Sequence, residues 1–287
     1  MKIERSFLIL AVAFLAMTSV LPAGTIYLLP TGTASPTVAS YSQEPFISRD
    51  PFDIPVSTKS IYINASNTKQ YLVSANATEA IVVQAASSSS RIRAINLGLG
   101  PTASTMTPNG QRLAVLAGGL HVYDTSNDSE LSPTFGIDVG ASPTMIASDL
   151  GSSRILVLSN SDRTVTAVDL ATQTVVGTPL PLGAEPNTMT VGPNGLLYVS
   201  AVNRVYEIDP RSMTLRGEIA ISGTPDKLVF TPDGTKALAV NTSPISGTIL
   251  FSFDLTTRTL AGTIPYGFTL TLDKVLVTSN ERAFALS

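Results

Sequence analysis

A recurring pattern of proline and glycine residues limits the folds that this chain of 287 residues can adopt. Three segments consist of a proline, six further residues and then Pro-Asn-Gly or Pro-Asp-Gly, and they begin at Pro101, Pro186 and Pro225. A fourth copy begins at Pro143 and keeps the register with a different turn at residues 148–151. Because Pro and Gly interrupt regular structure and favour tight turns, the pattern divides the chain into units of similar length.

Two degenerate copies extend the series, starting near Thr58 and Leu272, and give a period of roughly 40–45 residues. In the unit that begins at Pro186, turn residues separate four strand-like stretches, at 188–191, 196–200, 204–208 and 215–221. The second stretch is an almost unbroken apolar run, which is typical of a strand buried on both faces. Each unit therefore predicts one antiparallel sheet of four strands.

Such a sheet buries little apolar surface alone, so the sheets of a repeat protein must stack against their neighbours. Each fully buried Val, Leu or Ile contributes about 1.5–3 kcal/mol, and radial stacking also protects the sheet edges. We therefore predict an all-β fold, a β-propeller of four-stranded blades over residues 57–287, with about five full repeats and a partial one in an incomplete ring. The predicted units are 58–100, 101–142, 143–185, 186–224, 225–271 and the partial 272–287.

The best copies of the repeat, residues 155–195 and 196–240, share one order of features. An apolar strand precedes a polar turn, a second strand ends in Asp, and a Thr-rich or Ser-rich turn leads on to Pro-Asn-Gly or Pro-Asp-Gly. This order resembles the YVTN (Tyr-Val-Thr-Asn) propeller repeats of bacterial surface and secreted proteins, over roughly residues 58–287. The resemblance implies the fold more than an activity, since that family includes many uncharacterised exported proteins and a few enzymes.

Five and a fraction blades is an awkward number, because related propellers usually close with about seven. Residues 24–56 show no repeat, and we expect an irregular leader there with one strand at 25–29. Either this leader supplies missing strands or the chain is the N-terminal part of a longer protein. We favour the second explanation.

The N-terminus has the pattern of a secretory signal peptide over residues 1–23. Lys2 and Arg5 precede an apolar run at residues 7–17, and a small-residue exit follows at Ala23. The run is shorter than the ~20 residues that a membrane-spanning helix needs. We expect export to the periplasm, the cell surface or the medium, with no membrane span after cleavage.

Composition excludes several classes of function. The chain has no cysteine, which rules out disulfides, thiol nucleophiles and Cys-ligated metals. Its formal net charge of −3 and its charged content of 14% leave no basic stripe to neutralise the phosphates of a nucleic acid. We expect no cofactor and no metal. The partner is expected to be a protein, a glycan or an envelope component.

Two other sets of residues have a structural explanation. An aspartate recurs at the end of the third strand of a unit, as Asp124, Asp169, Asp209 and Asp254, and each precedes a polar turn. We interpret these residues as turn caps rather than calcium ligands, because Asp side chains accept hydrogen bonds from turn N–H groups. His121, the only histidine, occupies a strand position that is Thr, Tyr or Phe in other units, and we interpret it as a packing residue.

The candidate site is a pair of Asp-Lys dipeptides. Asp226 and Lys227 hold the same repeat positions as Asp273 and Lys274 in the next unit, just after the loop that enters the innermost strand. That placement predicts a location near one mouth of the central channel, where four charged groups could hold an anionic or polar ligand. The alternative is a solvated rim whose exposed ion pairs contribute ~0–1 kcal/mol each, and we favour it.

We therefore expect a binding scaffold with no catalytic site. Two alternatives stay open: a propeller enzyme of lactonase or dehydrogenase type with its site at the channel mouth, and a structural spacer in a longer surface protein. The absence of a Gly-x-Ser-x-Gly motif and of converging acid and base residues argues against the enzyme.

Overall fold

The computed structural model of this chain describes residues 25–28, 37–42, 48–53, 57–86, 90–243, 247–265, 274–279 and 282–286. Side chains are described for residues 57–86, 90–241 and 249–265. The predicted signal peptide, residues 1–23, lies outside these ranges. Within them every regular element is a strand, and no helix has the length and apolar character needed to cross a membrane.

Five antiparallel sheets, here called blades 1 to 5, follow one another between residues 58 and 265. Blade 1 holds β4 (Thr58–Ile63), β5 (Lys69–Ser74), β6 (Ile81–Ala85) and β7 (Arg91–Ile95). Blade 2 holds β8 (Ala103–Met106), β9 (Arg112–Leu116), β10 (Leu120–Asp124) and β11 (Ser129–Glu130). Blade 3 holds β12 (Pro143–Ser148), β13 (Arg154–Ser159), β14 (Thr164–Asp169), β15 (Thr174–Val175) and the additional short strand β16 (Leu180–Pro181), which also pairs with β14.

Blades 4 and 5 repeat the four-stranded order. Blade 4 holds β17 (Pro186–Val191), β18 (Leu197–Ala201), β19 (Arg204–Asp209) and β20 (Thr214–Ala220). Blade 5 holds β21 (Lys227–Phe230), β22 (Lys236–Ser243), β23 (Gly247–Asp254) and β24 (Thr259–Pro265). Each sheet forms within one of the units that the sequence repeat defines.

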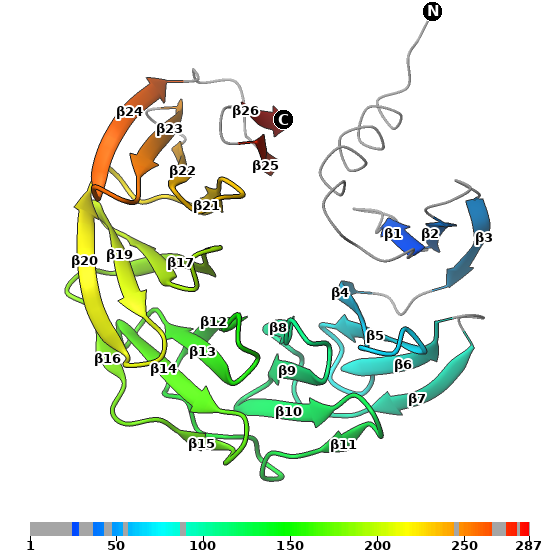
Figure 1. Cartoon of the computed structure of the whole chain (residues 1–287). Helices are drawn as coiled ribbons and strands as arrows, with labels where there is room; N and C mark the ends of the chain where they lie inside the picture. Colours follow the sequence, from blue (N-terminus) through cyan, green and yellow to red (C-terminus); the bar gives the residue numbers. More distant parts are fainter. Residues whose placement is uncertain are drawn as a thin grey trace, which may run out of the picture.

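The five blades are arranged around a common axis (Figure 1). The first strand of each blade lies innermost and the last strand lies at the outer rim. Inner strands of successive blades are in contact, as β8 with β12, β12 with β17 and β17 with β21. This radial array of four-stranded antiparallel sheets is a β-propeller, as the repeat predicts.

The apolar core lies between the blades rather than within them. Side chains alternate along a strand, so the second strand of each blade contributes to two interfaces. In β9, Leu113 and Val115 pack against blade 1, whereas Ala114 and Leu116 pack against blade 3. The interfaces between blades 3 and 4 and between blades 4 and 5 are built in the same way. Stacking of neighbouring sheets therefore buries the apolar surface that one sheet leaves open.

The turn between the first and second strands has one geometry in all five blades. Its last residue has a positive φ and donates its N–H to the carbonyl three residues earlier, as Gly110 does to Thr107 over 2.8 Å. The residues at this position are Asn67, Gly110, Ser152, Gly195 and Gly234. Gly adopts a positive φ without strain, which explains the Pro-Asn-Gly and Pro-Asp-Gly segments.

Two smaller sheets lie outside the five blades. The segment predicted as a leader with one strand holds three, β1 (Thr25–Leu28), β2 (Thr37–Ser42) and β3 (Ser48–Asp53), paired in that order. The last unit contributes the hairpin β25 (Lys274–Ser279) and β26 (Arg282–Leu286). Among the described strands, no hydrogen-bonded pairing joins this hairpin to β1–β3, so backbone pairing does not close the ring.

Candidate functional site

The predicted rim residues stand where inner strands begin. Lys227 begins β21 and Lys274 begins β25, and these two strands are in contact. Asp273 and the side chain of Lys274 lie outside the described part of the chain. The Asp226 carboxylate accepts a hydrogen bond of 3.3 Å from Asn187 Nδ2 on β17. Asp226 therefore links the inner strands of blades 4 and 5. The end of the central axis at which the inner strands begin is here called the channel mouth.

A cavity of about 310 Å³ lies at the same end of the inner strands of blades 1 to 3. Most of its lining comes from the first residues of β4, β8 and β12 and the loop before β8: Lys59, Ser60, Val73, Pro101, Thr102, Ala103, Ser104, Thr144, Met145 and Ile146. Four of these residues carry hydroxyl groups, and Lys59 has the one titratable side chain among them. The cavity can therefore offer hydrogen bonds, one ammonium group and apolar contact.

Lys59 holds the repeat position that Asp226 holds in blade 5. Ser60 pairs with Val73 in blade 1, as Lys227 pairs with Val240 in blade 5. The residue before each pair, Lys59 or Asp226, stands at the channel mouth. Lys59 was not among the candidate residues chosen from the sequence. Its place one residue after the start of the first unit, which matches that of Asp226 in the fifth unit, could have identified it.

Two exposed apolar side chains flank the Gly118-Gly119 turn on the channel-mouth face. Leu99 is 56% exposed and Phe135 is 90% exposed. A Cβ atom on Gly118 would lie 2.6 Å from Leu99 Cδ1, and one on Gly119 would lie 2.6 Å from the main-chain oxygen of Phe135. Both residues thus approach the same turn closely. They form an apolar rim, and Leu99 lies two residues before Pro101 of the cavity lining.

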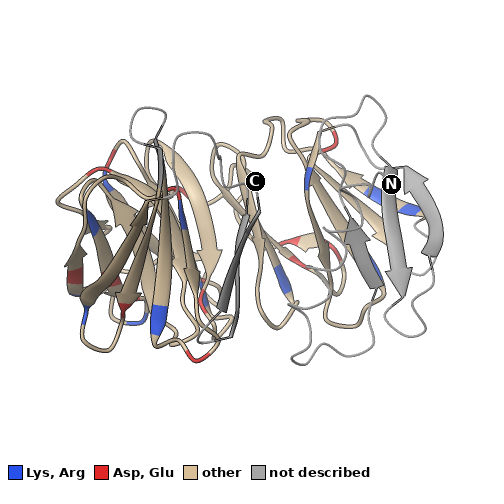
Figure 2. Cartoon of the chain, turned by 90° about the horizontal axis from the view of Figure 1, so that it is seen from above, with Lys and Arg blue, Asp and Glu red and all other residues tan. Residues whose placement is uncertain are grey.

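Charged residues are sparse over the whole molecule. In Figure 2, turned by 90° from Figure 1, Lys, Arg, Asp and Glu appear as separate marks with no large area of one sign. Within the described residues, no group of three or more His, Cys, Asp or Glu could hold a metal ion. Recognition at the cavity of blades 1 to 3 would therefore depend on hydroxyl groups, Lys59 and the apolar rim.

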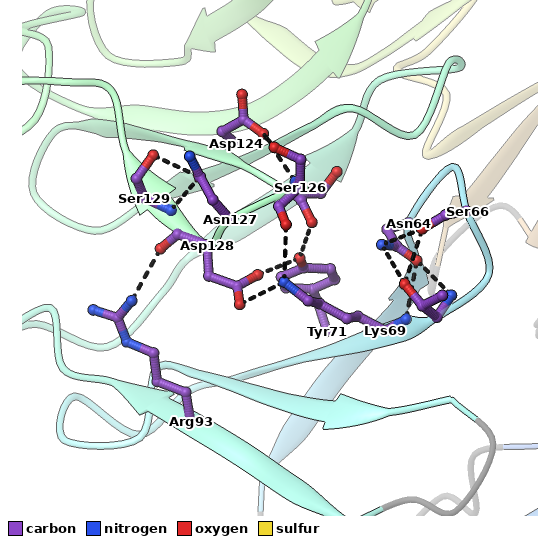
Figure 3. A network of polar contacts seen from close by, with 12 residues as sticks. Asn64, Ser66, Lys69, Tyr71, Arg93, Asp124, Ser126, Asn127, Asp128 and Ser129 are labelled. Carbon is purple, nitrogen blue, oxygen red and sulfur yellow. Dashed lines mark hydrogen bonds and ion pairs between the residues drawn. The ribbon is translucent and has the colours of Figure 1, made fainter.

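On the opposite face, a polar network joins blades 1 and 2 (Figure 3). The Tyr71 hydroxyl donates to Asp128 Oδ1 over 2.6 Å, and Lys69 Nζ lies 2.8 Å from Asp128 Oδ2. Lys69 also donates to the carbonyl of Ser126, and Arg93 donates to the carbonyl of Asp128. Burial is the main cause that raises the pKa of Tyr71, and the hydrogen bond to Asp128 raises the pKa further. The network anchors a surface turn of blade 2 to blade 1.

An equivalent network joins blades 4 and 5. Glu207 is 2% exposed and accepts a hydrogen bond of 2.9 Å from Arg258 Nη2 and one of 3.3 Å from the Tyr198 hydroxyl. Burial is the main reason why the pKa of Tyr198 rises to about 12. Hydrogen bonding to Glu207 raises the pKa of Arg258. Tyr198 occupies in β18 the position that Tyr71 occupies in β5.

Both networks use the same turn position. Asp128 and Arg258 each come four residues after the aspartate that ends the third strand, and each has a positive φ, 61° and 57° respectively. Gln173 and Met213 hold this position in blades 3 and 4, also with a positive φ. Met213 packs against the apolar cluster between blades 3 and 4. At this turn position, Asp128, Met213 and Arg258 thus place their side chains in the interface with the preceding blade, whereas Gln173 donates to the carbonyl of Leu170 in its own turn.

The recurring aspartates are turn caps, as the sequence analysis interprets them. Asp169 Oδ1 accepts hydrogen bonds from the main-chain N–H groups of Ala171 and Thr172, both at 2.9 Å. Asp124, Asp209 and Asp254 accept equivalent bonds in their own blades. The Thr172 N–H is the main cause that lowers the pKa of Asp169.

His121 is a packing residue, as expected, and it also makes a polar contact. It is 3% exposed, and its Nδ1 lies 2.6 Å from Glu130 Oε1. Its Nε2 lies 3.3 Å from the carbonyl oxygen of Ala117. Within the described residues no serine hydroxyl contacts the imidazole, and no Ser-His-Asp arrangement forms among them.

Comparison with solved structures shows similar architectures at low sequence identity. The Kuenenia stuttgartiensis hydrazine synthase matches with a TM-score of 0.55 at 18% identity, over 61% of this chain and 52% of that one. A functionally unknown protein from Desulfotomaculum acetoxidans DSM 771 matches with a TM-score of 0.62 at 16% identity, over 80% and 77%. The dihydro-heme d1 dehydrogenase NirN, in complex with DHE, matches with a TM-score of 0.68 at 14% identity, over 86% and 55%.

By fold, this chain is a β-propeller protein. At identities of 14% to 18% the likeness shows the fold alone, and the chain spans only about half the length of two of these structures. No protein-family model matches the chain, and no curated protein matches it. Membership of the YVTN family therefore stays a prediction.

Proposed function

We propose that this protein is an exported, non-catalytic propeller that binds a polypeptide partner at the channel mouth. The observation that carries the proposal is the cavity of about 310 Å³, whose lining holds several hydroxyl groups and a single titratable residue, Lys59. Catalysis by acid and base needs at least two converging groups with different roles. This lining suits recognition instead.

The apolar rim supports a protein as the partner. Phe135 is 90% exposed and approaches the same turn as the exposed Leu99, and apolar side chains that gather at one exposed place are typical of protein interaction sites. Lys59 adds one positive charge at the cavity. The partner segment would therefore place an acidic group at Lys59 and an apolar side chain on Phe135. Export, which the N-terminal pattern predicts, would bring the protein to envelope partners.

Capture from an envelope fraction by the immobilised protein tests this function when variants are compared. Phe135→Ser and Lys59→Glu should each reduce the captured partner at least tenfold. Leu150→Ser is the matched control, because Leu150 is 51% exposed in a turn on the opposite face, and it should capture as much as the unmodified protein. Equal capture by all four proteins would overturn the proposal.

The enzyme alternative has its own test. Two of the structural neighbours are named as enzymes, which shows that the architecture is compatible with catalysis. A screen of lactone and ester hydrolysis should give no turnover above that of buffer. Turnover that Lys59→Met abolishes would replace the binding function with a catalytic one at the same cavity.

A further inference from the structure

A second cavity, of about 370 Å³, lies at the seam between blades 1 and 2 on the face opposite the channel mouth. It is lined by the turn after β4, the start of β9 and the end of β10: Asn64, Ala65, Ser66, Gln111, Arg112, Asp124, Thr125 and Ser126. We call it the seam cleft. Lys59 is the second residue of β4 and Asn64 follows its end, so the two cavities lie at opposite ends of the same strand.

The walls of the seam cleft are fixed by contacts across the seam. The Ala65 N–H donates to the carbonyl of Gly110 over 3.2 Å, and the Thr125 hydroxyl donates to the same carbonyl over 2.7 Å. A Cβ atom on Gly110 would lie 2.7 Å from Ala65 N, so only glycine permits this approach. The cleft is therefore preformed, which reduces the entropy lost on binding a ligand.

Asn64 stabilises the turn after β4 that forms one wall of the seam cleft. It is 4% exposed, and its Oδ1 accepts the N–H groups of Thr68 and Lys69 at 2.9 and 3.0 Å. Its Nδ2 donates to the hydroxyl groups of Ser66 and Thr68. This orientation holds the Ser66 hydroxyl at the cleft wall, and Figure 3 shows Asn64 and Ser66 together at the side of the network that faces away from Arg93.

The charges in the cleft cancel. Arg112 Nη1 lies 2.7 Å from Asp124 Oδ2, and these are the two ionised side chains of the lining. An anionic ligand would meet the Asp124 carboxylate, and a cationic ligand would meet the Arg112 guanidinium. The cleft therefore favours a ligand without net charge.

The other groups of the cleft offer donors and acceptors together. The Ser126 hydroxyl donates to Asp124 Oδ1 and can still accept from a ligand, and the Ser66 hydroxyl accepts from Asn64 Nδ2 and bonds the Thr68 hydroxyl. The Gln111 side-chain amide supplies a donor that has no hydrogen-bond partner within the described residues. Ala65 is the one apolar residue of the lining. Such a surface suits a ligand covered with hydroxyl groups, since each hydroxyl both donates and accepts.

We propose that the seam cleft binds one sugar unit of a neutral glycan. Its volume of about 370 Å³ lies in the range of small-molecule sites, and its neutral, two-way hydrogen-bonding lining matches a saccharide better than a phosphate or a polyamine. This site goes beyond the proposed function, because it is separate from the channel mouth and takes a different class of ligand.

Isothermal titration calorimetry with maltotriose, cellotriose and chitotriose tests the proposal, with inorganic phosphate and spermidine as charged probes. At least one of the three sugars should bind with a Kd of about 1 mM or tighter. Phosphate and spermidine should bind at least tenfold more weakly than that sugar. Failure of all three sugars, or tighter binding of a charged probe, would overturn the proposal.

Variants locate the binding. Ala65→Trp should block the cleft and weaken sugar binding at least tenfold, and Gln111→Ala should weaken it several-fold. Leu150→Trp places the same bulk at the equivalent turn of blade 3 and should leave the affinity unchanged. Unchanged affinity in Ala65→Trp would contradict the assigned location. Phe135→Ser should bind sugar normally and Ala65→Trp should capture the envelope partner normally, so the two proposals can fail independently.

Discussion

The Tyr71 hydroxyl lies 2.6 Å from Asp128 Oδ1, and this contact joins two residues 57 positions apart across the seam of two blades. Asp128 stands in a left-handed turn position, and Lys69 approaches its other oxygen. Both side chains of the ion pair are largely covered, with 19% of Lys69 and 9% of Asp128 exposed. The stacked sheets are thus held by specific polar contacts as well as by apolar packing.

Removing the Tyr71 hydroxyl should weaken this seam. Tyr71→Phe removes the hydroxyl that donates to Asp128 Oδ1 and to the carbonyl of Thr125 in a covered site, and the free energy of unfolding should fall by about 1–3 kcal/mol. Urea denaturation followed by circular dichroism measures the change.

Tyr206→Phe is the matched control for that variant. The Tyr206 hydroxyl is buried and has no hydrogen-bond partner within the described residues, so its loss should be neutral or slightly stabilising. A loss of stability in Tyr206→Phe as large as that in Tyr71→Phe would contradict the role given to the Asp128 contact.

Loss of one partner of the Glu207–Arg258 pair should strongly lower the stability of the fold. Arg258→Met leaves the carboxylate of Glu207, which is 2% exposed, without its cation, and an unpaired buried charge is strongly unfavourable. The urea midpoint should fall clearly. Arg91→Met breaks the exposed Arg91–Glu79 pair and should change the midpoint little.

A second substitution separates the charge from the packing. In the double variant Glu207→Gln with Arg258→Met the buried group is neutral, so much of the lost stability should return. A double variant no more stable than Arg258→Met would show that the arginine contributes by packing alone.

The turn aspartates should make the fold sensitive to acid. The Thr172 N–H, followed by the Ala171 N–H, lowers the pKa of Asp169 below its ordinary value of 3.8, and the Thr257 N–H does the same to Asp254. A carboxyl whose pKa is lower in the folded state stabilises the fold above the unfolded value. That stability should be complete above about pH 4 and should be lost as the pH falls through the folded pKa.

Asp169→Asn tests the acid effect. The amide oxygen can still accept both turn N–H groups but does not titrate, so the variant should lose less stability than the unmodified protein between neutral pH and about pH 2. Urea midpoints over that range provide the measurement. Identical pH profiles for the two proteins would show that Asp169 makes no contribution to the acid sensitivity.

The sequence predicted the blades well because their signals are local. Pro-Asn-Gly at residues 108–110 and the aspartate at Asp169 specify turns through bonds within a few residues. The seam contacts were missed, because each joins residues more than 50 positions apart and the αL turn position carries four unlike residue types: Asp128, Gln173, Met213 and Arg258.

The candidate site was predicted only in part. The repeat placed Asp226 and Lys227 at the start of an inner strand, but the cavity lies beside Lys59 in blades 1 to 3. The lining of this cavity comes from side chains of three blades together, which no single repeat unit specifies. The hydrogen bond from Asn187 to Asp226 joins two inner strands in blades 4 and 5, and no pattern of spacing reveals it.

Distances between spin labels test the radial stacking on which this account depends. The chain has no cysteine, so label pairs can be placed at the equivalent exposed turn positions of the five blades: Ala65, Pro108, Leu150, Pro193 and Pro232. Double electron–electron resonance should give distances from residue 65 to residues 108, 150 and 193 that increase by a smaller step each time. The distance to residue 232 should be no longer than the distance to residue 193. Distances that increase in equal steps with each blade would mean a straight stack without a central channel.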